Sequence, residues 1–275
     1  MGALAGVLWR SLGRLWGRDM MLFVGGVSFF VMLATFPGLM LLVGIYGLVL
    51  TPEAAADQAE SLAALMPGGA RDLVASELRR LAYAPAGAIS AQSGLALLVA
   101  LYAAHRGFKA LIAGLSFVHD EEAPHGLIRF NLLALGLLAA AFLALPAISA
   151  AFLAFQVVGA TLGIELLGAQ GQWLGAGSGV ILALTLIYRF AMSSRPVLWR
   201  ASLAGAVSAT ALTLAASWGA ALYVNASKGL GAAYGSVTAV VILLIWLSWS
   251  VQAIFFGGAL ATEMERYLEG EPASG

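Results

Sequence analysis

Residues 20–50, MMLFVGGVSFFVMLATFPGLMLLVGIYGLVL, decide the class of fold, because the whole stretch carries no charged side chain. A helix that rises about 1.5 Å per residue needs about 20 apolar residues to cross the hydrocarbon core of a bilayer. The stretch is longer than that, so it predicts a transmembrane helix. Pro37 lies in its middle and lacks a backbone N–H, so we predict a hinge there; a tolerated kink is the alternative.

The rest of the chain has the same character. Of its 275 residues, 61% are hydrophobic and 10% are charged, whereas roughly 25% are charged in soluble proteins. Such a chain cannot cover its surface with polar groups in water. This excludes a soluble enzyme, a secreted disulfide scaffold and a disordered protein. Long unbroken apolar runs indicate helices rather than alternating strands, so we expect an all-α, polytopic membrane protein.

The apolar runs between charged residues predict one domain, residues 20–266, built as a bundle of six transmembrane helices. Its spans are expected at about 20–50, 88–106, 128–158, 173–191, 200–225 and 234–263, with a short helical outer loop at 51–87. A cytoplasmic tail follows at 267–275. Ten of the fourteen Lys and Arg residues then lie on the same side as both termini. Because positive residues accumulate in cytoplasmic segments, both termini are expected in the cytoplasm.

Residues 1–19 are expected to form a cytoplasmic amphipathic helix. Arg10, Arg14 and Arg18 recur every four residues and so form one basic stripe. Leucines cover a different face, with Trp9 and Trp16 as anchors at the interface. The pattern predicts an amphipathic helix that lies against the anionic headgroups of the membrane.

The fifth expected span carries small residues at every fourth position. They are Ala201, Gly205, Ala209, Thr213, Ser217 and Ala221. Small residues allow helix backbones to approach closely in lipid, where packing supplies the energy of association. The stripe therefore predicts a tight seam between helices inside the monomer; a homodimer seam is the alternative.

Polar side chains in the expected spans mark a candidate substrate pathway, because polar groups are costly in lipid. His105, Arg106 and Lys109, at the end of the second span, are expected to attract an anionic group to the cytoplasmic mouth. Ordinary positive-inside anchoring is the alternative. Further hydrogen bonds along the path are expected from Ser28, Thr35, Asn225, Tyr234 and Gln252, with helix packing as the competing interpretation.

The segment 119–125, HDEEAPH, contains two imidazoles and three carboxylates. Its spacing matches no zinc signature, so we expect a solvated loop without a metal. The chain has no cysteine, and it lacks the nucleophile-elbow and phosphate-loop motifs. We therefore expect no enzyme, no catalytic residue and no cofactor. The net charge is zero, so no nucleic-acid partner is expected.

Three blocks then stand in order along the chain. The first block is 25–37, with its aromatic pair Phe29-Phe30. The second is 101–111, followed by Asp120-Glu121-Glu122, Gly126 and Asn131. The third begins with Asn225 and Tyr234-Gly235-Ser236 and continues to Trp246 and Gly257-Gly258-Ala259. Together they resemble the YihY/BrkB family of bacterial inner-membrane proteins, formerly described as ribonuclease BN-like. The sequence departs from the family pattern at Ser116, which replaces an Asn. It departs again at Ala259, which replaces a Glu whose role Glu263 is the candidate to take over.

The resemblance implies a location in the bacterial inner membrane and partners among membrane lipids. Members of the family have been linked to serum resistance and to export of a lipid A precursor. Together with the polar residues in the spans, this predicts a transporter or exporter of a lipid or small amphipathic solute through a polar cavity. The alternatives are a non-transporting scaffold or envelope-integrity factor and, third, a membrane hydrolase built on 119–125.

Overall fold

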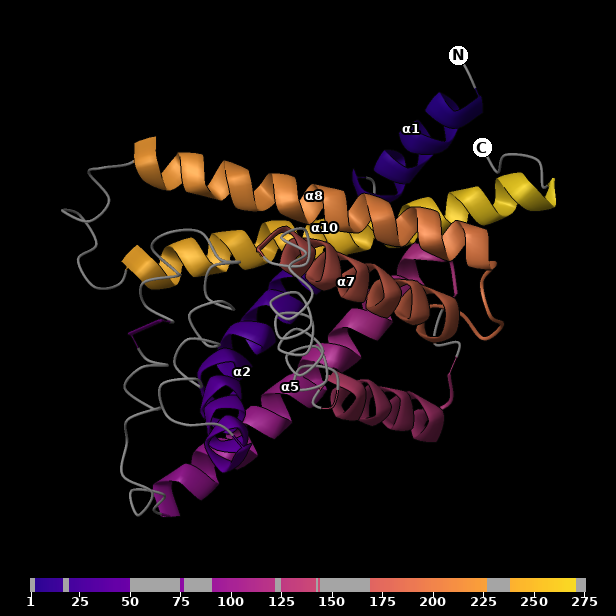
Figure 1. Ribbon diagram of the computed structural model, residues 1–275. Coiled ribbons are helices and arrows are strands. Elements are labelled where there is room, and N and C mark those ends of the chain that lie inside the picture. Colours follow the sequence, from indigo (N-terminus) through magenta and orange to yellow (C-terminus); the bar gives the residue numbers. More distant parts are fainter. Residues whose placement is uncertain are drawn as a thin grey trace, which may run out of the picture. The chain divides into compact units, whose positions relative to one another are not determined.

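The computed structural model of the protein describes residues 3–16, 20–49, 75–76, 91–121, 125–141, 143, 169–226 and 238–270. All regular structure within these ranges is α-helical, which confirms the all-α prediction (Figure 1). The helices are α1 (Ala3–Trp16), α2 (Met20–Val49), α5 (Ala91–Val118), a helix over Leu127–Ala141, α7 (Ala169–Ala191), α8 (Trp199–Ala226) and α10 (Thr238–Glu269).

Three of the described helices contain stretches that are long and apolar enough to cross a membrane. These are Leu97–Val118 in α5, Trp199–Tyr223 in α8 and Val240–Glu269 in α10. A fourth candidate combines Ala5–Trp16 with Met20–Thr35 as one broken span. The expected third span, the outer loop 51–87 and the start of the expected sixth span extend outside the described residues.

α5 continues beyond the end expected for the second span. The helix runs to Val118, although Arg106 was expected to mark its cytoplasmic end. The reason is local: residues 110–118, ALIAGLSFV, carry no charge and continue the apolar run. The helix ends where the His119 N–H bonds to the Leu115 carbonyl at 3.0 Å and Asp120 adopts a φ of 63°. Such a left-handed residue is a common end for a helix.

The chain forms two compact units. Unit 1 comprises Met1–Phe23, Phe108–Leu212 and Gln252–Gly275, and unit 2 comprises Val24–Gly107 and Thr213–Val251. The core of unit 1 includes Tyr188, Phe255, Ile112, Leu115 and Met192, all fully buried. In unit 2, Leu243 and Leu247 form a buried cluster on which Met32 and Trp246 pack.

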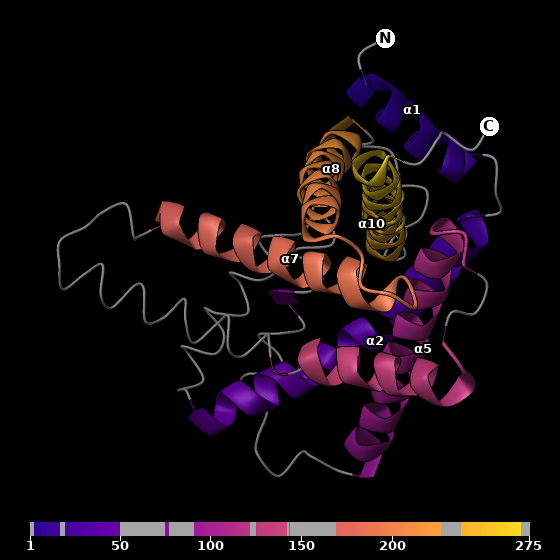
Figure 2. The ribbon, with the colours of Figure 1, turned by 90° about the vertical axis from the view of Figure 1, so that its right-hand side faces the viewer.

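Small residues hold α8 against α10, and the two helices lie side by side in both views (Figure 1, Figure 2). A Cβ added to Gly257 would lie 2.6 Å from the Gly205 carbonyl oxygen and 2.7 Å from Ala209 Cβ. Along the same pair of helices, in unit 2, Trp246 Nε1 donates a hydrogen bond to Ser217 Oγ at 2.9 Å. The predicted small-residue stripe therefore forms a seam within the chain at these positions.

Candidate functional site

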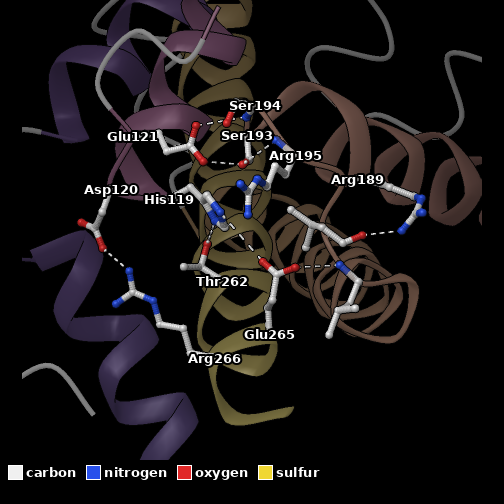
Figure 3. Close-up of polar contacts among 12 residues, drawn as sticks. His119, Asp120, Glu121, Arg189, Ser193, Ser194, Arg195, Thr262, Glu265 and Arg266 are labelled. Atoms are coloured by element: carbon white, nitrogen blue, oxygen red, sulfur yellow. Dashed lines mark hydrogen bonds and ion pairs between the residues drawn. The ribbon is translucent and has the colours of Figure 1, made fainter. Parts of the chain in front are cut away.

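Charged and polar side chains tie together the ends of several helices in unit 1. We call this set the polar cluster; part of it is shown in Figure 3. Its members are Arg10, Arg14, His119, Asp120, Glu121, Ser193, Thr262, Glu263, Glu265 and Arg266. They come from α1, from the residues directly after α5, from the connection between α7 and α8, and from the last turns of α10.

Glu263 anchors α1 to α10. Its Oε1 accepts a hydrogen bond from Arg14 Nε at 2.6 Å, and its Oε2 accepts one from Arg10 Nε at 2.7 Å. The Glu263 side chain is 6% exposed and that of Arg14 is 10% exposed. Water therefore screens these charges less than it screens a surface pair. A buried carboxylate with both oxygens bonded is well compensated, whereas removing either partner is costly.

Arg14 also reaches the end of α5. Its NH1 group donates to the Val118 carbonyl at 3.0 Å and to Asp120 Oδ2 at 2.5 Å. The same Asp120 oxygen accepts a hydrogen bond from Arg266 of α10 at 2.9 Å. Arg10 and Arg14 therefore bind protein carboxylates, and Arg18 lies outside the described residues; that the N-terminal helix lies against lipid headgroups stays a prediction.

His119 packs against α10. His119 Nδ1 lies 2.9 Å from Thr262 Oγ1, which also donates to the Gly258 carbonyl of its own helix at 3.1 Å. His119 Nε2 lies 3.9 Å from Glu265 Oε2. Burial lowers the pKa of His119 from its usual 6.5; Glu121 opposes this shift, and nearby arginines add to it. The imidazole is therefore neutral at pH 7.

Two carboxylates hold the connection between α7 and α8 (Figure 3). Glu121 accepts hydrogen bonds from the Ser193 hydroxyl and from the Ser194 N–H, the latter at 3.0 Å. Glu265 Oε1 accepts the Leu198 N–H at 2.8 Å, directly before α8 begins. A carboxylate at this place satisfies a free backbone donor and complements the positive end of the helix. Partial burial acts to raise the pKa of Glu121, but the hydrogen bonds from Ser193 and Ser194 lower it.

The expectation of a solvated 119–125 loop is wrong for its two histidines, because the His119 side chain is 14% exposed and His125 is buried, whereas Asp120 is exposed. His119, Asp120 and Glu121 belong to the polar cluster, and His125 is 4% exposed, with Nε2 3.3 Å from the Ala191 carbonyl. Spacing along the chain could not reveal this, because the partners come from distant helices. In the part of the chain that the structure describes, no three His, Asp or Glu residues are placed to hold a metal ion. The contacts of the cluster join α1, the end of α5, the connection between α7 and α8, and α10.

The predicted pathway residues of α5 contact neutral groups. Arg106 is exposed, and its guanidinium carbon lies 5.7 Å from the centre of the Tyr102 ring. Lys109 Nζ donates to Asn131 Oδ1 at 2.9 Å and lies 5.3 Å from the centre of the Phe130 ring. His105 is partly buried.

The other predicted pathway residues lie on α2, α8 and α10. The Ser28 side chain is buried, and its hydroxyl has no hydrogen-bond partner in the described part of the chain. Thr35 bonds to the Val31 carbonyl of its own helix at 2.7 Å, and Gln252 Nε2 lies 3.3 Å from Met21 Sδ. α2 is helical through position 37. The side chains of Pro37 and Asn225, and all of Tyr234, lie outside the described residues.

The described contacts of the predicted pathway residues go to other residues and not to one another. The feature that sequence reasoning missed is the polar cluster. Its signal was present at the end of the last apolar run, where Glu263, Glu265 and Arg266 follow within four residues. Charges at such a place need partners, and the arginines of the N-terminal helix were available to supply them.

The comparison with protein families agrees with the sequence blocks quoted above. The family model described as virulence factor BrkB matches residues 11–274, a range that includes nearly all of the polar cluster and all of α5, α8 and α10. No solved structure matches the chain. Because the match covers almost the whole chain and the described fold consists of apolar helices, the protein belongs to the virulence factor BrkB family of membrane proteins.

Proposed function

We propose that this membrane protein is a transporter or exporter of a lipid or small amphipathic solute that carries an anionic group. The observation that carries the proposal is the position of Arg106 and Lys109 inside the continuous helix α5, within its apolar stretch Leu97–Val118. Lys109 lies nine residues, about 14 Å at about 1.5 Å per residue, before the end of that helix. Ionisable residues inside a span are costly and commonly mark substrate pathways.

The partners of these cations support the choice of an anionic group. Lys109 is held by the Asn131 amide and the Phe130 ring, and Arg106 lies over the Tyr102 ring; all of these partners are neutral. Within the described ranges neither cation has a carboxylate at ion-pair distance, whereas Arg14 is paired with Glu263 and Asp120. A cation with neutral partners keeps its charge available to an incoming phosphate or carboxylate.

The proposal includes a membrane location and topology. Six spans in the bacterial inner membrane, with both termini in the cytoplasm, place ten of the fourteen Lys and Arg residues on the cytoplasmic side. The exposed large apolar side chains on the described helices suit lipid as their solvent; among them are Leu98 at 65%, Leu182 at 59% and Leu214 at 61% exposed. α1 then lies on the cytoplasmic surface of the membrane.

The test is lipid translocation in reconstituted vesicles. Fluorescent phosphatidylglycerol is placed in both leaflets, and a membrane-impermeant reductant bleaches the molecules that reach the outside. Without translocation, only the fluorescent lipid of the outer leaflet is bleached, which is about half of the total. We expect the protein to raise the bleached fraction above this half, and we expect the increase to be lost in Lys109→Gln and Arg106→Gln. Arg200→Gln is the matched control, because Arg200 is an exposed cation at the start of α8. Bleaching equal to that of protein-free vesicles, with correctly folded protein, would contradict the proposal.

A non-transporting scaffold is the second candidate. The tight contact between Gly205 and Gly257 and the paired charges around Glu263 favour it, because both join helices firmly. We propose transport or scaffolding rather than hydrolysis. The carboxylates of Glu121, Glu263 and Glu265 are engaged by arginines, by a serine hydroxyl or by backbone N–H groups, so they are poorly placed to act on a substrate.

A further inference from the structure

α1 has two unlike faces. On the inner face, Val7 is 1% exposed, Ser11 is fully buried, and Arg10 and Arg14 are bonded to Glu263. On the outer face, large apolar side chains are exposed: Leu8 at 47%, Trp9 at 76%, Leu12 at 44% and Trp16 at 90%. Nothing within unit 1 covers this outer face in the described residues.

Helix geometry explains why the faces are opposed. At about 100° per residue, positions 8, 12 and 16 fall on one side of the helix axis, and positions 10 and 14 fall near the opposite side. Ion pairs fix the basic side against protein, so the apolar side must point away from it. Arg14, at 10% exposed, is therefore not free to reach lipid phosphates, and Arg10 is bonded to Glu263. The side of α1 that lies away from these ion pairs carries leucine and tryptophan.

We propose that α1 binds the boundary between acyl chains and headgroups through Leu8, Trp9, Leu12 and Trp16, and that this binding does not require anionic lipid. The inference rests on the proposed place of α1 at the membrane surface, and it adds the face and the chemistry of contact. The bilayer is the occupant because α1 is followed after three residues by α2, which is uncharged throughout. Tryptophan is also the residue that favours this depth of the membrane.

The chain contains no cysteine, so single-cysteine spin labels give a direct test. Leu12→Cys and Trp16→Cys place labels on the apolar face. Gly13→Cys is the matched control in the same turn, because Gly13 is exposed and a Cβ there meets no atom within 4 Å. Collision with oxygen is compared with collision with a water-soluble nickel chelate, in phosphatidylcholine vesicles with and without phosphatidylglycerol.

We expect the labels at positions 12 and 16 to favour oxygen equally in both lipid mixtures, and the label at 13 to be more accessible to nickel. Insertion that occurs only with phosphatidylglycerol would overturn the inference, since it would mean that the arginines bind headgroups. Water-accessible labels in both mixtures would also overturn it. Spin–spin broadening between labels would show that a second copy covers the face, and this too would overturn it.

A variant of Glu263 is expected to make the insertion of α1 depend on anionic lipid. Glu263→Gln removes the carboxylate that holds Arg10, whereas Arg14 keeps its ion pair with Asp120. One freed arginine contributes about 1 kcal/mol beside an anionic surface, so insertion should become roughly 5-fold more favourable with phosphatidylglycerol than without it. If Glu263→Gln does not fold, the double variant Arg10→Gln with Arg14→Gln tests the same point. Its labels should insert equally in both mixtures, and loss of insertion in phosphatidylcholine would count against the inference. Neither measurement uses lipid translocation, so a negative result here would contradict the inference about α1 without contradicting the proposed transport function.

Discussion

Replacing Gly257 by alanine is expected to destabilise the seam between α8 and α10. The new Cβ would lie 2.6 Å from the Gly205 carbonyl oxygen, 2.6 Å from Tyr188 Oη and 2.7 Å from Ala209 Cβ. Ordinary contact begins at 3.4 Å, and neither a backbone oxygen nor an alanine methyl can rotate away. The helices must therefore separate locally by about 0.8 Å, which loosens the packing on both sides of the contact.

The magnitude follows from two opposed terms. Overpacking costs about 1–3 kcal/mol, and the rigid obstruction at Gly257 places it near the upper end of that range. Alanine in place of glycine within a helix returns about 1 kcal/mol. The net loss is about 2 kcal/mol. At about 2–4 °C per kcal/mol for a chain of this size, the apparent midpoint of thermal unfolding should fall by about 4–8 °C.

The assay heats the detergent-purified protein and measures the monodisperse fraction by size exclusion. Gly136→Ala is the matched control, because Gly136 is inside the helix Leu127–Ala141 and its added Cβ meets no atom within 4 Å. It should leave the midpoint unchanged or raise it slightly. Equal midpoints for the Gly257 and Gly136 variants would refute the reasoning, because the seam would then not be as close as the structure shows.

Three more predictions concern the polar cluster and unit 2. Burial lowers the pKa of His119 below 6.5, so between the two pKa values the imidazole is protonated in the unfolded chain but neutral in the folded protein. The stability that is present above pH 6.5 is therefore lost as the pH falls. Thermal midpoints between about pH 5 and 6.5 should therefore fall less in His119→Gln, and parallel curves would contradict this. Ser193→Ala removes a donor that lowers the pKa of Glu121, so Glu121 contributes less stability that acid can remove. Thermal midpoints below about pH 4.5 should therefore fall less steeply in Ser193→Ala than in the unchanged protein, and parallel curves would argue against it. Trp246→Phe removes the donor to Ser217 and should cost about 1 kcal/mol in the same thermal assay. Combined with Ser217→Ala it should cost less than the sum of the single changes, and strict additivity would show that the bond contributes nothing.

The all-α membrane class followed from apolar runs such as residues 20–50, because a bilayer leaves helices as the main way to satisfy the backbone. The α8 seam was also predictable, since a spacing of four residues places Gly205 and Ala209 on one face. The extent of α5 was not predicted. Arg106 was interpreted as the border of the span, yet the apolar residues after Lys109 continue the helix to Val118. A border assigned from charge can therefore lie well before the end of the helix.

The sequence by itself determined what depends on neighbours along the chain: the helices, their apolar faces and the basic stripe of Arg10 and Arg14. Only the tertiary structure decided what those arginines bind. Their partner Glu263 lies 253 and 249 positions away, and helical periodicity carries no information about such a pair. An arginine stripe suits a phosphate headgroup or a buried carboxylate equally well by charge. The choice depends on which group the packed helices bring within hydrogen-bonding distance, and in this protein they bring the carboxylate.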